Sequence, residues 1–256
     1  MTSSGFAEVA PGVHVATSRV MTTTSTVLAH GDAVVLVDPA WRRDELVAIA
    51  DGLDGLGLRP TAGFSTHAHH DHLLWHPRYG DVPRWAAPRA AELAAGEETA
   101  LREALGADYP DDVLALFAQV TALPGDPGDP GVTVPDTDLE VVVHDGHAPG
   151  HAALLDPATG VMVAGDMLSD VELPLPFWPD DLPAYLAGLD RLAPAVARAR
   201  VLVPGHGTPS YAPLERLDAD RRYLDDVIAG RVPDDPRLAN EGMREMYDRL
   251  VAMVRR

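Results

Sequence analysis

The sequence contains neither cysteine nor lysine, and each absence excludes a class of chemistry. Without cysteine, the chain cannot form disulfides, use a thiolate nucleophile or bind zinc through sulfur. Without lysine, all 20 basic residues are arginine, against 39 acidic residues and a formal net charge of −19. Such an acidic chain is a poor general binder of phosphate backbones or anionic membranes. We therefore expect a small-molecule substrate, with neither nucleic acid nor a membrane as a partner.

Long apolar segments are also missing. No apolar run approaches the ~20 residues that a membrane-spanning helix needs. Residues 1–8 carry no basic region and no apolar core, so they do not resemble a signal peptide, and we expect a cytoplasmic protein. A chain of 256 residues can bury one sizeable core. We predict a single domain over residues 1–256, without deciding between a monomer and a homodimer.

What the sequence does contain is a histidine-rich run at residues 65–72, Ser-Thr-His-Ala-His-His-Asp-His. Neutral imidazole and carboxylate are the usual protein ligands of zinc and related divalent ions. A helix would scatter these side chains around its circumference, whereas a tight loop after a strand can direct several of them at one point. Residues 61–66 are partly β-branched and apolar, which predicts such a strand. A purification tag is the other common source of such a run, but tags sit at termini and this run is internal.

The rest of the chain alternates between strand and helix patterns. Strands are predicted at 6–10, 13–17, 25–29, 33–37, 61–66, 84–88, 138–144, 152–155, 161–164 and 201–203, and helices at 43–56, 89–120, 181–198, 211–230 and 238–255. A further helix is expected to start at Leu73. Residues 88–135 are predicted to be a helical and proline-rich, lid-like insertion, and residues 211–255 to be C-terminal helices. The strand–helix–strand order predicts a layered α/β fold.

Several predicted strands end in a potential metal ligand. These candidates are His67, His69, Asp71 and His72 after one strand, and His147, Asp166 and His206 after three others. Glycine precedes each of the last three, and glycine lets the backbone pass close to a crowded centre. Strand ends on one edge of a sheet are where α/β proteins commonly place chemistry. Asp38 ends the strand at 33–37, where it either caps a turn or orients a ligand histidine.

These motifs resemble those of the metallo-β-lactamase superfamily. His-Ala-His-His-Asp-His at 67–72 matches the family's HxHxDH signature, and residues 146–151 resemble its GHTPGH element. Residues 163–166 resemble its strand ending in Gly-Asp, residues 203–207 its Pro-Gly-His-Gly, and residues 31–38 its N-terminal strand ending in Asp. The five elements occur in the family order over about residues 10–210. The resemblance implies an α/β fold built as a four-layer αβ/βα sandwich, with two mixed sheets and helices on the outer faces.

The resemblance also implies a binuclear metal centre. His67, His69 and His147 would bind one ion, Asp71, His72 and His206 the other, and Asp166 would bridge both. His151 could take the place of His147, but the family ligand directly follows the first glycine, which leaves His151 beside the site. Two divalent ions are expected, with zinc first and manganese or iron as alternatives.

The implied activity is metal-assisted hydrolysis. A hydroxide shared by the two ions, with Asp71 and Asp166 as catalytic residues, would attack an ester, lactone or thioester carbonyl. The site pattern is nearest to glyoxalase II-like thioesterases and lactonases. A bridging Asp166 and the lack of cysteine depart from the true β-lactamases, so β-lactam hydrolysis is the weaker alternative. Another alternative is a mononuclear iron oxygenase similar to persulfide dioxygenases, and a third is a non-catalytic scaffold.

Aromatic residues near the motifs are candidates for the wall of an acyl pocket. Phe177 and Trp178 lie in an apolar, proline-stiffened loop at 173–179, shortly after Asp166, and Trp75 follows the histidine run. Core packing explains each of these rings equally well.

Overall fold

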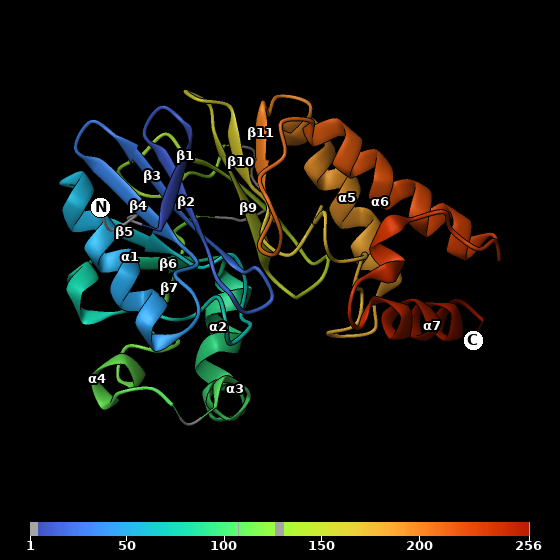
Figure 1. Cartoon of the computed structure of the whole chain (residues 1–256), viewed down its shortest axis with the longest axis horizontal. Coiled ribbons are helices and arrows are strands. Elements are labelled where there is room, and N and C mark those ends of the chain that lie inside the picture. The colour runs from blue at the N-terminus through green and yellow to red at the C-terminus, as the bar shows by residue number, and fades with distance from the viewer. Residues whose placement is uncertain (1–4, 107, 126–130, 256) are drawn as a thin grey trace.

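The computed structural model of the chain describes residues 5–106, 108–125 and 131–255. Two mixed β-sheets face each other, and helices cover their outer faces (Figure 1). The first sheet has the order β1 (Phe6–Ala10), β2 (Val13–Thr17), β3 (Thr24–His30), β4 (Ala33–Val37), β5 (Ala62–Phe64), β6 (Arg84–Ala86) and β7 (Thr121–Ala122). The second has the order β11 (Val201–Val203), β10 (Val161–Val163), β9 (His151–Asp156) and β8 (Glu140–His144). The predicted four-layer α/β sandwich is confirmed.

The helices divide between the two outer layers. Beside the first sheet are α1 (Arg43–Leu56), α2 (Pro88–Gly96), α3 (Glu98–Leu105) and α4 (Asp111–Leu114), and beside the second are α5 (Leu182–Val196), α6 (Pro213–Ile228) and α7 (Met243–Val254) (Figure 1). Two short 3₁₀ helices lie at Pro77–Tyr79 and Pro236–Ala239. No described helix is both long enough and apolar enough to cross a membrane.

The layers follow from the two-residue period of strands whose two faces are both apolar. In β4, Val35 and Val37 point into the core between the sheets, while Leu36 points out and packs with the α1 residue Leu53. In β10, Val161 and Val163 likewise face inward, whereas Met162 packs with residues of α5 and α6. Strands that are apolar on both faces can only lie between two covering layers.

Two expectations around the histidine run and the insertion are wrong. No helix starts at Leu73, because the chain leaves the loop in irregular structure and the first helical turn begins at Pro77, where a missing backbone N–H costs nothing. The helical pattern at 89–120 is divided into α2, α3 and α4. Glu97 separates α2 from α3, α3 ends at Leu105, and α4 begins at Asp111. The predicted loop after it contains β7, and residues 126–130 lie outside the described part of the chain.

Trp75 packs in the core against the backbone of Gly63. Its indole donates to the carbonyl of Gly80 at 3.1 Å, and a Cβ on Gly63 would come within 2.6 Å of the indole ring. We therefore expect Gly63→Ala to lower the free energy of unfolding by about 1–3 kcal/mol, measured by urea denaturation. Gly55→Ala is the control, because this exposed glycine of α1 has no atom within 4 Å of the added carbon. Equal stability of the two variants would contradict the tight packing.

Candidate metal centre

The seven predicted ligands come together at the carboxyl ends of the strands. His67 to His72 occupy the loop after β5, His147 follows β8, Asp166 follows β10 and His206 follows β11. Because β4 pairs in parallel with β5 and β10 with β11, these ends share one edge of the sandwich. Backbone hydrogen bonds join the two sheets at this edge, from Thr24 to Gly205 at 2.7 Å and from Ala152 to Thr66 at 2.8 Å.

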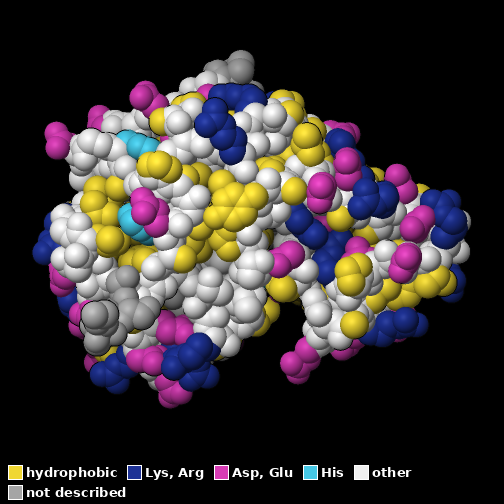
Figure 2. All heavy atoms as spheres, turned by 45° about the horizontal axis from the view of Figure 1, so that its top comes forward, with side chains coloured by type: hydrophobic (Ala, Val, Ile, Leu, Met, Phe, Trp, Pro, Cys, Tyr) yellow, Lys and Arg dark blue, Asp and Glu magenta, His cyan; other side chains and the backbone are white. Residues whose placement is uncertain are grey.

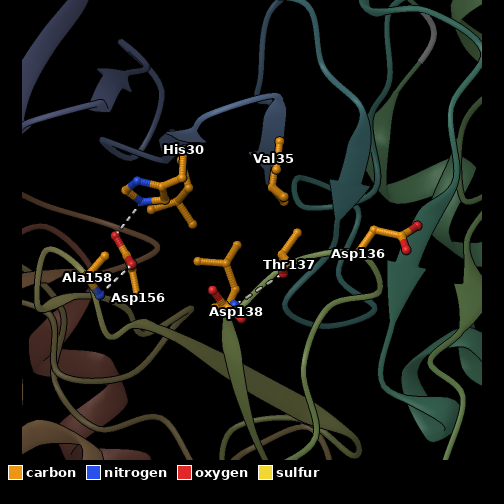
Figure 3. Close-up of a pocket in the computed structure, with 10 residues that line it drawn as sticks. His30, Val35, Asp136, Thr137, Asp138, Asp156 and Ala158 are labelled. Carbon is orange, nitrogen blue, oxygen red and sulfur yellow. Dashed lines mark hydrogen bonds and ion pairs between the residues drawn. The ribbon is translucent and has the colours of Figure 1, made fainter.

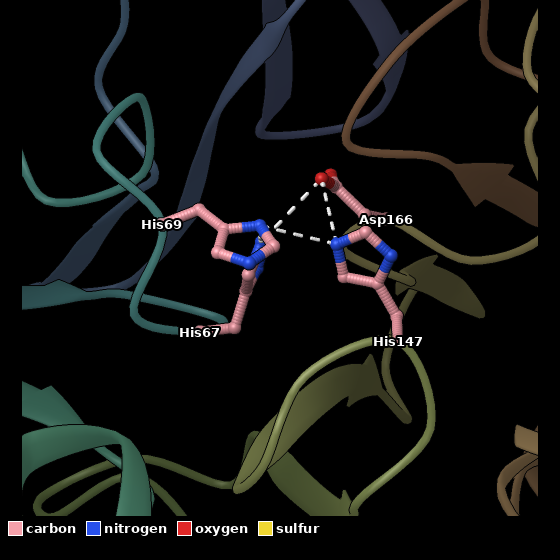
Figure 4. Close-up of side chains that lie close together, drawn as sticks. All are labelled: His67, His69, His147 and Asp166. Carbon is pink, nitrogen blue, oxygen red and sulfur yellow. Dashed lines mark hydrogen bonds and ion pairs between the residues drawn. The ribbon is translucent and has the colours of Figure 1, made fainter. Parts of the chain in front are cut away.

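The first group of ligands consists of His67, His69, His147 and Asp166, whose side chains point at one another (Figure 4). The Nδ1 atom of His69 lies 2.9 Å from His67 Nε2 and 3.2 Å from His147 Nε2. The Oδ2 atom of Asp166 lies 3.4 Å from the Nε2 atoms of both His67 and His147. Three ring nitrogens and one carboxylate oxygen therefore converge.

The second group consists of Asp71, His72 and His206, all buried. Asp71 Oδ2 lies 3.4 Å from His72 Nε2 and 3.3 Å from His206 Nε2. Asp166 also reaches this group, because its Oδ1 lies 3.2 Å from His72 Nε2 and its Oδ2 lies 3.3 Å from His206 Nε2. One carboxylate thus faces both groups.

The donor atoms fit divalent metal ions. Tetrahedral zinc with ligands at 2.0–2.1 Å separates neighbouring donors by about 3.3 Å, and the separations within the two groups are close to that value. His72 Nε2 and Asp166 Oδ1 are buried and have no hydrogen-bond partner among the described residues. Buried polar atoms are normally paired, so buried donor atoms that converge without a hydrogen-bond partner fit a bound cation.

The electrostatics of the first group favour neutral ring nitrogens. Burial lowers the pKa of His67 to about 4 and holds the pKa of His69 well below its usual value. Neutral imidazole is the form that binds a metal.

In the second group, the charges of the carboxylates determine the direction of the pKa shift of His72. Burial lowers the pKa of His72, but the charges of Asp166 and Asp71 outweigh it and raise that pKa well above 6.5. Burial raises the pKa of Asp166, yet the charge on His206 and other histidines holds it well below the usual range of a carboxyl. The carboxylates therefore remain ionised and favour positive charge between them.

Asp38 orients His72 from behind. Its φ of 47° places the residue in the left-handed region, and its Oδ2 accepts from Thr66 Oγ1 at 2.6 Å and lies 2.9 Å from His72 Nδ1. Its Oδ1 accepts from the backbone N–H of Thr66 at 2.8 Å. A carboxylate on the outer nitrogen fixes both the direction and the basicity of a ligand histidine.

We expect Asp38→Asn to weaken metal binding by about 10- to 100-fold, because the amide has one acceptor oxygen and no charge, whereas the carboxylate accepts from both donors of Thr66 and faces His72 Nδ1. Competition with a chromogenic chelator would measure the affinity. Asp32→Asn, in the exposed turn between β3 and β4, is the matched control. Equal affinities in the two variants would show that Asp38 only caps the end of β4.

His151 lies beneath the site rather than in it. The residue begins β9 and is fully buried, and its ring stacks on that of His67 with 4.9 Å between centroids. Its Nε2 accepts from the backbone N–H of Asp166 at 3.0 Å. His151 therefore supports two of the converging residues without joining either group.

Close backbone approach explains the glycine before His206. A Cβ on Gly205 would collide with Asp166 Oδ1, so any side chain there would displace the carboxylate that both groups share. The sequence predicts that this glycine lets the backbone pass close to a crowded centre, and the contact between Gly205 and Asp166 Oδ1 agrees with that prediction.

A cavity of about 390 Å³ opens onto the ligand groups, with a mainly apolar wall. Of the predicted aromatic wall residues, only Trp178 lines it, 45% exposed and 6.0 Å from the ring of His69. Phe177 lies in the core beneath the guanidinium of Arg249, and Trp75 lies in the core beside Gly63. Core packing is therefore the role of both rings.

Leu175, from the apolar loop that the sequence singles out, also lines the cavity. The other wall residues carry no sequence signal, and they are Met21, Trp41, Leu101, Ala104 and Glu172. These come from turns and from α3, and long-range folding alone brings them to the cavity.

A second cavity, of about 450 Å³, lies at the opposite ends of the strands (Figure 3). Its buried carboxylate, Asp156, is already paired with His30 at 2.7 Å and with the backbone N–H of Ala158 at 3.0 Å. Asp136 is directed away from this pair. The buried carboxylate of this cavity is therefore already satisfied by described neighbours.

Comparison with known proteins agrees with this geometry. Residues 19–206 match the family model described as the metallo-beta-lactamase superfamily, which is well over half of the chain. The chain therefore belongs to the metallo-β-lactamase superfamily. No curated protein matches the sequence.

Solved structures share the fold. A metallo-beta-lactamase family protein from Thermus thermophilus, TTHA1429, is 22% identical, with a TM-score of 0.65 over 95% of this chain and 92% of that one. A beta-lactamase domain protein from Burkholderia ambifaria is 23% identical, with a TM-score of 0.62 over 90% and 79%. TTHA1623, solved in a di-iron-bound form, is 26% identical, with a TM-score of 0.56 over 78% and 96%.

Proposed function

We propose that the protein is a binuclear metal-dependent hydrolase that cleaves an ester, lactone or thioester bond. The observation that carries this proposal is the position of Asp166, whose two oxygens face both ligand groups at 3.2–3.4 Å. When bound, two divalent ions polarise a carbonyl group and make water a nucleophile at neutral pH.

The chain's own residues would organise this chemistry. His67, His69 and His147 would hold one ion and Asp71, His72 and His206 the other, with Asp166 between them. Asp71 and Asp166 supply negative charge that balances the ions and can accept hydrogen bonds from the attacking water. No serine or cysteine nucleophile is needed, and Trp41, Leu175 and Trp178 give the cavity an apolar wall beside the ligands.

The cavity favours a small substrate with an apolar acyl part. No arginine of the described chain lines it, so it offers no such partner for a phosphate or a second carboxylate. On the face shown in Figure 2, arginine side chains are interleaved with acidic ones instead of forming a continuous basic strip. Both features favour a small neutral or cationic substrate over a nucleic acid.

The second ligand group favours two ions over one. A mononuclear iron oxygenase would need only His67, His147 and Asp166, and would leave the convergence of Asp71, His72 and His206 without a role. We propose zinc as the native ion, because imidazole and carboxylate suit it. Iron is the main alternative, since TTHA1623 was solved with two irons.

Metal content and hydrolysis together test the proposal. Protein purified without chelator should contain about two zinc ions per chain by plasma mass spectrometry, and should hydrolyse members of a panel of aryl esters, lactones and thioesters. One iron per chain, with oxygen uptake on thiol substrates, would instead support the oxygenase. Protein that binds no metal, even after reconstitution, would overturn both and leave a scaffold.

A further inference from the structure

One charged side chain of the cavity belongs to neither ligand group. Glu172 lines the same wall as His147, Asp166 and His206. Its backbone is held on both sides, since its N–H donates to Ser169 Oγ at 2.9 Å and its carbonyl accepts from Arg237 Nη1 at 2.9 Å. The hydroxyl of Ser169 in turn donates to the carbonyl of His206 at 2.7 Å. Glu172 is thus fixed relative to a metal ligand.

The carboxylate of Glu172 has no partner within the described protein. Among the residues that the structure describes, none donates a hydrogen bond to it or forms an ion pair with it, and none that lines the cavity is an arginine. A partly buried carboxylate without a partner is unfavourable, so this side of the cavity favours a cationic ligand over an anionic one.

The rest of the wall suits the same kind of ligand. Trp41 and Trp178 line the cavity, and the faces of aromatic rings attract ammonium groups. The guanidinium of Arg249 already lies 5.4 Å from the ring of Trp178, so Trp41 is the ring offered to a further cation. Met21, Leu101 and Leu175 provide apolar surface for the carbon chain that would link such a group to the scissile carbonyl. A negative charge, aromatic rings and an apolar wall together define a site for an apolar chain with one positive end.

We propose that Glu172 is a specificity-determining residue that recognises a protonated amine on the acyl substrate. The inference rests on the proposed function for the reaction itself. It adds the substrate class: acyl compounds that carry an ammonium group, separated from the cleaved bond by a short apolar chain. Anionic acyl compounds would be rejected by the same carboxylate.

A set of isosteric esters tests the preference on zinc-loaded protein. The nitrophenyl esters of ω-aminohexanoic and heptanoic acid differ only in an ammonium or a methyl end. We expect wild type to prefer the ammonium ester by about tenfold or more in kcat/KM, because hydrogen bonds between charged groups are the stronger ones. Glu172→Gln should bring this ratio to about one, whereas Glu241→Gln, at an exposed glutamate before α7, should keep it. A wild-type ratio near one, or a ratio unchanged by Glu172→Gln, would overturn the proposal.

Binding without turnover separates this inference from the proposed function. Hexylamine is protonated at pH 7, which disfavours ligation of a metal by its nitrogen, and hexanol is its neutral counterpart. We expect tryptophan fluorescence to show about tenfold tighter binding of hexylamine to wild type, and no such difference in Glu172→Gln. This result would support the inference even if no ester were hydrolysed, in which case only the hydrolase proposal fails. Equal binding of the amine and the alcohol to wild type would overturn the inference, whatever esters are cleaved.

Discussion

Replacing Asp166 with alanine is expected to cause the largest loss of activity of any single substitution in this chain. The carboxylate lies 3.2–3.4 Å from four ring nitrogens, two in each ligand group, so its removal takes a donor from both metal positions at once. We expect metal content to fall from about two ions per chain to below one. Hydrolysis should fall by about 10³-fold or more, equivalent to about 4 kcal/mol of transition-state stabilisation.

Thermal unfolding provides a second measurement for this variant. A ligand that binds only the folded state stabilises it by about 4 kcal/mol at a thousand times its Kd, so added zinc should raise the Tm of wild type. The Tm of Asp166→Ala should respond far less. Asp218→Ala, at an exposed position on α6, is the matched control and should behave as wild type. Two tightly bound ions in Asp166→Ala would contradict the bridging role.

The candidate ligands could be identified in the sequence because their signals are local. Asp166 and His206 each stand directly after an apolar strand and a glycine, and parallel pairing then places their strand ends at one edge. The order of the strands in the sheets could not be predicted, because pairing depends on contacts between distant segments. Aromatic residues posed the same difficulty. Nothing in the sequence around Trp75 or Phe177 distinguishes a core ring from a pocket ring such as Trp178.

Glu172 shows the same limit within the site. In sequence it is one acidic residue between Val171 and Leu173, indistinguishable from a solvated surface charge. Its position depends on Arg237, which is 65 residues away in the chain. A sequence pattern can therefore identify ligands that belong to one strand end, but not a wall residue placed by a later segment.

Arg237 itself should be the residue whose loss most reduces stability. Its guanidinium is 2% exposed and donates to Asp220 Oδ1 at 2.6 Å, to both oxygens of Asp235, and to the carbonyls of Ser169 and Glu172. Asp220 is 1% exposed, so Arg237→Met would leave a buried carboxylate without its cation. We expect the free energy of unfolding to fall by about 3–5 kcal/mol, measured by urea denaturation at a fixed zinc concentration.

Two further variants separate the buried charge from the carbonyl contacts. Arg198→Met removes a guanidinium that binds Glu140 at 2.6 and 2.7 Å on the surface, and such exposed pairs contribute only about 0–1 kcal/mol. The double variant Arg237→Met/Asp220→Leu should recover much of the lost stability, because the fully buried lone charge is gone and Asp235, at 9% side-chain exposure, keeps the backbone N–H of residue 237 as a partner. Metal affinity should stay reduced in it, since the carbonyl of Glu172 still lacks its donor, the carbonyl of Ser169 keeps only Arg216, and Ser169 holds His206. A loss in Arg237→Met no larger than in Arg198→Met would contradict this role.

Because Arg237 lies beyond residues 19–206, the expected result would make the C-terminal segment part of the metal centre's support.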